Sequence, residues 1–129
     1  LSILVPVNGT AASRRAAEVA IAIARAAKAP LTALYVAPSG KNKTRRSGQY
    51  EEAILKDIVA LADSYSLQIK TAVRTDVAAD EAIVKEMSRR RNNLLVLGVG
   101  RRPGDKLFFG DTAAALLEKS TKSLVFVAT

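Results

Sequence analysis

The 129-residue sequence contains no cysteine and no histidine. These absences exclude disulfides, metal sites built from thiolate or imidazole ligands, and nucleophiles that depend on a histidine base. A chain without cysteine fits a reducing compartment, so we expect a cytoplasmic protein. Its apolar runs are about as long as a strand and fall far short of the ~20 residues that cross a bilayer.

Aromatic residues make up only 5% of the chain, whereas hydrophobic residues make up 49% and are mostly alanine, valine, leucine and isoleucine. This length and composition suit one domain over residues 1–129, with helices packed closely on a sheet. The formal net charge is +8. It favours anionic partners such as nucleotides, nucleic acid or a membrane surface, and solubility with nonspecific attraction explains it equally well.

Strand-like and helix-like segments alternate along the chain. Short apolar runs predict strands over residues 2–7, 31–37, 67–73, 94–98 and 124–128. Helical periodicity predicts helices over residues 11–29, 49–65 and 110–119, and a further helix that is capped within residues 76–80 and ends at about residue 90. Strands joined by helices run parallel, and unalternating runs such as 94–97 indicate burial on both faces. The sequence therefore predicts an α/β fold with an open, doubly wound, five-stranded parallel sheet and helices on both faces.

Periodicity also predicts which residues of each helix face the sheet. They are Ala16, Val19, Ala20, Ile23 and Ala27 in the first helix, Ile54, Ile58, Leu61 and Tyr65 in the second, and Ile83 and Met87 in the third. Residues 38–48 are polar, basic and rich in turn formers, which predicts a mobile loop. The run Arg89-Arg90-Arg91 ends the third helix, where cations complement the helix dipole.

In sheets of this kind, ligands bind beyond the carboxyl ends of the strands, where the strand order reverses. Residues 6–10, 36–38 and 98–112 are expected to form one crevice there. The last segment combines glycines, the start of a helix, and the cations Arg101, Arg102 and Lys106, which together suit an anion. A surface loop whose glycines only make turns explains this segment equally well.

Both ends of the chain resemble the universal stress protein family. The opening Ile3-Leu4-Val5-Pro6-Val7-Asn8-Gly9-Thr10 is similar to its first-strand signature I-L-V-P-x-D-G-S/T, and residues 94–128 resemble its fourth strand, glycine loop, last helix and fifth strand. The resemblance covers nearly the whole chain except the basic residues 41–46. It implies the sheet order 3-2-1-4-5 of the adenine nucleotide alpha hydrolase-like fold, and a homodimer paired through the fifth strand, Leu124 to Ala128.

The resemblance also implies a site for ATP or another adenine nucleotide. ATP-binding members share G-x-x-G-x(9)-G-S/T; here Gly100 and Gly110 keep the nine-residue gap, while Gly98 lies one position too close to Gly100. Asn8 replaces the usual aspartate, and Asp111 replaces the usual phosphate-binding serine or threonine. The residues that the resemblance assigns to the ligand are Pro6, Val7, Asn8, Val36, Leu97, Gly98, Gly100, Arg101, Gly110, Asp111 and Thr112.

Asp111 weighs against ATP. Serine and aspartate are both good helix N-caps, but a carboxylate ~4 Å from a phosphate is repelled by about 1 kcal/mol in water and by several-fold more in a partly dry cleft. The sequence therefore favours an N-cap role for Asp111, although Arg101, Arg102 or Lys106 could offset the repulsion and Thr112 could supply a hydroxyl. Asn8 either only shapes the Asn-Gly-Thr turn or also bonds a ribose or a base edge.

No catalytic constellation is visible, so we expect a protein that is not an enzyme and holds no metal. Most acidic residues are expected on helix exteriors or in turns: Glu51, Glu52, Asp57, Asp63, Asp76, Asp80, Glu81, Glu86 and Asp105. No aromatic residues interleave with the basic clusters, so no specific nucleic acid is expected. The aromatic residues fit core or interface positions better: Tyr35, Tyr50, Tyr65, Phe108, Phe109 and Phe126.

Three functions stay open. The first is a noncatalytic regulatory or stress-response domain with a nucleotide or anion in the crevice. The second is the cytoplasmic regulatory domain of a bacterial monovalent cation:proton antiporter-2 type transporter. The Leu1 start, Asn8-Gly9-Thr10 and residues 108–112 resemble such domains, and positive charge suits the inner leaflet. The chain is then a segment of a longer protein attached to a membrane antiporter. The third is a dimerisation module with a vestigial crevice.

Overall fold

The computed structural model describes residues 1–37, 45–75, 78–100 and 111–128, with the backbone alone for 45–47. Its elements follow in the order β1 (Ile3–Val7), α1 (Ala11–Ala27), β2 (Leu31–Val36), α2 (Arg45–Ser64), β3 (Lys70–Arg74), α3 (Ala79–Arg90), β4 (Leu94–Val99), α4 (Asp111–Lys119) and β5 (Ser123–Ala128). The predicted alternation of strands and helices is confirmed.

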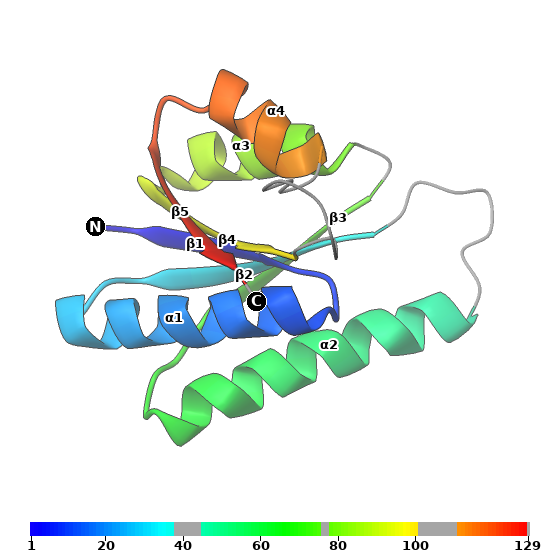
Figure 1. The fold of residues 1–129 in the computed structure, drawn as a ribbon. Helices are drawn as coiled ribbons and strands as arrows, with labels where there is room; N and C mark the ends of the chain where they lie inside the picture. Colours follow the sequence, from blue (N-terminus) through cyan, green and yellow to red (C-terminus); the bar gives the residue numbers. More distant parts are fainter. Residues whose placement is uncertain (38–44, 76–77, 101–110, 129) are drawn as a thin grey trace.

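The five strands form one parallel sheet in the order β3-β2-β1-β4-β5. α1 and α2 cover one face, and α3 and α4 cover the other (Figure 1). β1 pairs with β2 along its whole length, whereas its ladder with β4 covers only Ile3 and Leu4 at the amino end. The doubly wound fold and the strand order are confirmed, and the place where the order reverses lies between β1 and β4.

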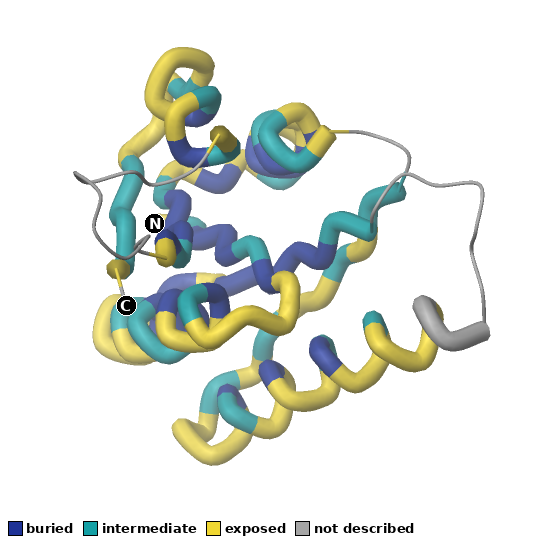
Figure 2. Tube along the Cα trace, turned by 45° about the vertical axis from the view of Figure 1, so that its right-hand side comes forward, coloured by how far each residue is buried: buried dark blue, intermediate teal, exposed yellow. Residues whose placement is uncertain are grey.

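Each face of the sheet carries its own apolar core. Ile3, Val5 and Val7 of β1 pack on the α1 side, whereas Leu4 belongs to the cluster that contains Ile83 of α3. Successive residues of a strand point to opposite faces, so β1 contributes to both cores. In Figure 2 the residues coloured as buried follow the central strands, whereas α2 has buried residues only on the side that faces the sheet. The centre of the sheet is therefore covered on both faces, as the unalternating strands predict.

The buried face of α1 differs from the predicted one. The buried residues are Ser13, Ala16, Ala17, Ala20, Ile21 and Ala24. Val19 and Ile23 are half-buried on its flank, and Ala27 is exposed. The helix turns its small residues toward the sheet because these allow its backbone to approach β1 and β4 closely.

The second helix is longer than predicted at its start. α2 begins at Arg45 and not at Gln49, so residues 45–48 of the predicted loop are helical; residues 38–44 lie outside the described part. Ile54 and Ile58 are buried as expected, and Leu61 is half-buried. Tyr65, predicted to be buried, is exposed beyond the end of the helix.

The connection from α2 to β3 is also longer than predicted. Ser66 adopts a positive φ of 57° and the Leu67 amide donates to the Ala62 carbonyl at 2.9 Å, so this segment still closes the helix. β3 therefore begins at Lys70, three residues later than expected. Ala62 fills the buried position at the end of α2.

The start of α3 lacks the side-chain cap that the sequence suggested. Ala78 is the N-cap and makes no side-chain hydrogen bond. Asp80 lies in the first turn, where a carboxylate is favoured by the helix dipole, and Asp76 lies outside the described residues. Ile83 and Met87 are buried, as predicted. Among the helices of the described ranges, none combines the length and the apolar composition that a bilayer crossing requires.

Candidate functional site: a cleft at the carboxyl edge of the sheet

A cleft of about 290 Å³ opens at the carboxyl ends of the central strands. Its described lining comes from the ends of β1, β2 and β4, the first turn of α1, and the amino-terminal halves of α3 and α4: Pro6, Val7, Asn8, Ser13, Leu34, Val36, Ala79, Ile83, Leu97, Gly98, Asp111, Thr112 and Ala113. This is the edge at which open α/β sheets hold ligands.

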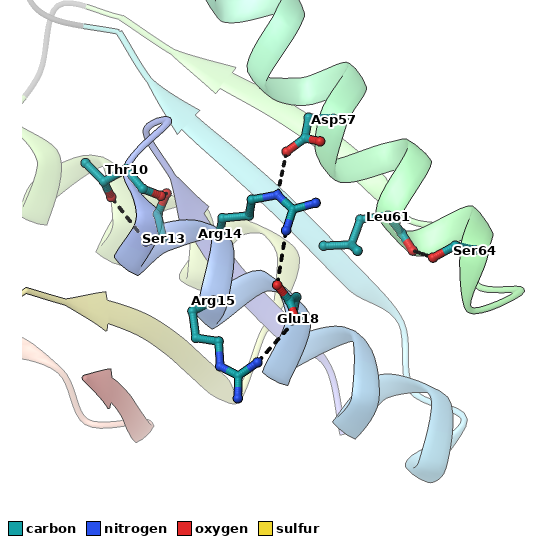
Figure 3. Close-up of polar contacts among 8 residues, drawn as sticks. All are labelled: Thr10, Ser13, Arg14, Arg15, Glu18, Asp57, Leu61 and Ser64. Atoms are coloured by element: carbon teal, nitrogen blue, oxygen red, sulfur yellow. Dashed lines mark hydrogen bonds and ion pairs between the residues drawn. The ribbon is translucent and has the colours of Figure 1, made fainter. Parts of the chain in front are cut away.

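The turn from β1 to α1 is fixed by a closed set of short hydrogen bonds. The Asn8 side-chain oxygen accepts from the Thr10 amide at 3.1 Å and from the Thr10 hydroxyl at 2.7 Å. Thr10 in turn caps α1 by accepting from the Ser13 amide at 3.1 Å (Figure 3). The Ser13 hydroxyl accepts from the Asn8 amide at 3.2 Å.

Asn8 therefore shapes the turn and faces the cleft at the same time. Its side-chain oxygen is occupied by Thr10, and its NH₂ group makes no hydrogen bond to the described residues. The two roles that the sequence left open are compatible, because the turn uses only the acceptor. The free NH₂ group is a donor that a ligand could use.

Two glycines beside the cleft have structural reasons. Gly9 has a φ of 84°, a conformation that strains any residue with a side chain. A Cβ on Gly98 would overlap the carbonyl of Ala12. Gly98 thus lets β4 pass close to the first turn of α1, which gives it a role that needs no phosphate.

The structure brings together eight of the residues that the sequence assigned to a ligand: Pro6, Val7, Asn8, Val36, Leu97, Gly98, Asp111 and Thr112. Gly100 is exposed and does not line the cleft. Arg101 and Gly110 lie outside the described residues, as do Arg102 and Lys106. Whether the eight residues bind a ligand stays a prediction.

Sequence reasoning missed five lining residues: Ser13, Leu34, Ala79, Ile83 and Ala113. Ser13 could have been found from the sequence. It lies three residues after the predicted cap Thr10, and the residue at that position is the one whose amide bonds the cap, so it lies next to the turn. Ile83 was predicted to face the sheet, and Leu34 was placed only within the predicted strand 31–37. The structure shows both residues in the core and in the cleft wall. α3 was not expected to reach the crevice.

Asp111 is the only charged residue in the described lining. It was predicted to be the N-cap, but it is the first residue of α4 itself, and it is exposed. A carboxylate in the first turn complements the helix dipole. Asp111 therefore still favours the start of α4, although it is not the N-cap. No group of three potential metal ligands occurs in the described part of the chain.

A cluster of ion pairs around the buried Glu86 ties α3 to the edge strand β3, and it corrects the expected exposure of Glu86. Only 1% of the Glu86 side chain is exposed. Its carboxylate accepts from Arg74 at 2.7 Å and from Arg90 at 2.6 Å. Burial raises the pKa of Glu86, but the hydrogen bonds from Arg90 and Arg74 outweigh it and lower that pKa below its usual value. Arg90 thus neutralises a buried carboxylate, beyond the dipole role predicted for it.

On the opposite face, an exposed network ties α1 to α2. Arg14 donates to Asp57 at 3.0 Å and to Glu18 at 3.1 Å, and Arg15 donates to Glu18 at 3.3 Å (Figure 3). Exposed pairs of this kind contribute little stability individually. They orient α2 beside the β1–α1 turn, where the Tyr50 hydroxyl also donates to the Asn8 carbonyl at 3.4 Å.

Comparisons with known proteins agree with this architecture. The model of the universal stress protein family matches residues 2–128. No protein of curated function matches the chain in a sequence comparison.

Several solved structures share the fold. The universal stress protein from Archaeoglobus fulgidus matches with a TM-score of 0.84 and 19% identity over 98% of this chain and 97% of that one. The universal stress protein from the same organism in complex with dAMP matches with a TM-score of 0.80 and 17% identity, over 98% and 96%. A family protein from Arabidopsis thaliana with AMP bound matches with a TM-score of 0.73 and 17% identity, over 98% and 90%.

Proposed function

Because the chain belongs to the universal stress protein family, we propose that it is a noncatalytic regulatory protein whose cleft holds an adenine nucleotide. The observation that carries the proposal is the convergence of eight sequence-assigned residues on one cleft at the carboxyl edge of the sheet. Structures of similar fold contain dAMP and AMP. The same proposal assigns the protein to the cytoplasm.

The lining suggests how such a ligand would be held. Leu97 and the half-buried Val36 offer apolar surface to a base, and Asn8 offers a side-chain NH₂ group. Thr112 contributes a hydroxyl, whereas the buried Ser13 hydroxyl already donates to the Thr10 carbonyl at 3.1 Å. An apolar pocket with a few convergent polar groups is the usual composition of a small-molecule site.

The carboxylate of Asp111 sets the charge that the cleft tolerates. Each additional phosphate near it adds repulsion of about 1 kcal/mol at ~4 Å in water. We therefore propose that adenosine, AMP or a cyclic nucleotide fits this cleft better than ATP.

Filling the cleft tests the proposal. Titration calorimetry with AMP should give saturable heat for the wild type, and Val36→Phe, which places a ring in the cleft, should weaken binding at least tenfold. Val59→Phe is the matched control, because Val59 lies on the exposed side of α2 and away from the cleft. Absence of heat with adenosine, AMP and cyclic AMP would refute the ligand assignment.

A second role, self-association, is favoured by the contrast between the two sheet edges. β5 presents half-buried Leu124, Val125 and Val127 with no charged residue between Ser123 and Ala128. The opposite edge strand, β3, carries Lys70 and Arg74, and charges discourage edge pairing. We propose that a second copy pairs along β5. Attachment to a membrane antiporter stays a prediction.

A further inference from the structure

A second groove lies between the carboxyl-terminal half of α3 and the turn that joins α4 to β5. Its volume is about 520 Å³, and its described lining is Val84, Met87, Ser88, Arg91, Lys119, Ser120, Thr121 and Lys122. It shares no residue with the cleft described above. α3 and α4, which provide half of its described lining, lie together on one face of the sheet (Figure 1). Small-molecule sites have volumes of ~300–1,000 Å³, so the groove is large enough for one.

The described lining contains three cations and no carboxylate. Arg91 and Lys122 are exposed, and neither has an ion-pair partner among the described residues. Lys119 donates to Asp80 at 2.6 Å, and Glu81 and Glu118 lie near enough to raise its pKa further. Two cations in the groove are therefore uncompensated.

Helix dipoles explain only part of this charge. Arg91 closes α3 in a left-handed conformation with a φ of 57°, and Lys28 closes α1 in the same way with a φ of 53°. A cation at such a position complements the dipole. Lys122 has no such reason, because it lies three residues beyond the end of α4.

Hydroxyl groups stand beside the free cations. The Ser120 hydroxyl oxygen accepts from the Lys122 amide at 3.1 Å, which leaves its proton available to donate and fixes Lys122 next to it. Ser88 and Thr121 add two further hydroxyls, and Val84 and Met87 give an apolar floor. Cations and O–H donors around an apolar floor match a phosphate ester with a small organic part.

We propose that this groove is a second anion site, which takes a phosphate-bearing small molecule. The proposal does not depend on the ligand of the main cleft. Titration of the isotopically labelled protein with inorganic pyrophosphate, at constant ionic strength, should shift the amide signals of Ser88, Arg91 and residues 120–122 saturably. R91N/K122Q should weaken this binding at least fivefold, and Asn tolerates the left-handed conformation at position 91.

The matched control is K28N/R25Q, which removes the same charge from the end of α1 on the other face of the sheet. It should change the affinity less than twofold. Equal weakening by both double variants, or shifts confined to the main cleft, would overturn the proposal. Thermal unfolding of both variants checks that the fold is intact.

A phosphate group could also belong to a lipid. Cosedimentation with phosphatidylcholine vesicles, with and without phosphatidylglycerol, separates this source from a free phosphate compound. Retention by the anionic vesicles that R91N/K122Q abolishes and K28N/R25Q leaves intact would support a headgroup as the source. If the wild type shows neither saturable shifts nor such retention, the groove is no anion site.

Discussion

Asn8 and Asp111 both line the cleft, and each also has a structural role in the element that carries it. The Asn8 side-chain oxygen accepts from Thr10, and its NH₂ group has no partner among the described residues. A ligand could therefore bond this NH₂ group without any change in the turn. Asp111 begins α4 and places a full negative charge at the cleft. An exchange that removes this charge should therefore alter the preference for ligand charge more than the fold.

Asp111→Asn is expected to bind ATP at least fivefold more tightly than the wild type, while its affinity for adenosine changes less than twofold. The reason is the repulsion of about 1 kcal/mol per nearby phosphate charge, with 1.4 kcal/mol equal to a factor of ten. Glu118→Gln, at the other end of α4, is the control for net charge. Calorimetric affinities for both ligands decide the matter, and an unchanged ATP-to-adenosine ratio would contradict it.

Gly98 shows how sequence reasoning can find a residue and miss one of its roles. The sequence suggested a glycine that lets a backbone approach a phosphate, and the structure adds a close approach to the Ala12 carbonyl of α1. The sequence contains the glycine and not the neighbour that requires it, because Ala12 and Gly98 come together only in the folded sheet.

Among the elements, α3 couples the core to the cleft. Its Ile83 lines the cleft, and one turn later Glu86 joins Arg74 of the edge strand β3. The sequence did not reveal this cluster, because Glu86 is one of 12 acidic residues in the chain and Arg74 lies 12 residues before it. Only the pairing of β3 with β2 places Arg74 within reach.

Glu86→Gln is expected to lower the free energy of unfolding by about 2 kcal/mol. Breaking one partner of a fully buried pair costs ~3–5 kcal/mol, and the arginines here are 34% and 28% exposed, which reduces the loss. Glu52→Gln is the matched control, because Glu52 forms an exposed pair with Lys56 at 3.0 Å and should cost less than ~0.5 kcal/mol. Urea unfolding of both variants at neutral pH measures the two losses in unfolding free energy. Equal losses would contradict a stabilising role for the buried Glu86 ion pairs.

The difference in unfolding free energy between the wild type and Glu86→Gln should depend on pH. The folded-state pKa of Glu86 is lowered, so on acidification the unfolded chain binds the proton first. Its stabilisation is complete above about pH 4.5 and is lost as pH falls toward the folded-state pKa. The stability difference between wild type and Glu86→Gln should therefore be constant between about pH 7 and 5 and shrink below. A difference that grows on acidification would show that the wrong ionisation state was assigned.

For the whole molecule, the alternation of apolar runs and periodic helices was sufficient to predict the doubly wound sheet, because connected parallel strands have few alternatives. The strand order came from the family resemblance and is confirmed. Helix faces and element ends were less predictable. α1 presents alanines to the sheet in place of its larger Val19 and Ile23, and the close of α2 at Leu67 depends on a hydrogen bond that no pattern shows.

The two sheet edges decide how the molecule meets a copy of itself. If β5 pairs with a second β5 about a twofold axis, the strands run antiparallel and Ser123 approaches Ala128 of the copy. S123K/A128K would then oppose lysines at both ends of the interface, where like charges are destabilising.

Sedimentation velocity should show a dimer of the 13.7 kDa chain for the wild type and a monomer for this variant. Thr71→Lys on exposed β3 should leave the dimer intact. A wild type that stays monomeric at tens of micromolar, or a dimer that Thr71→Lys disrupts instead, would remove β5 as the interface.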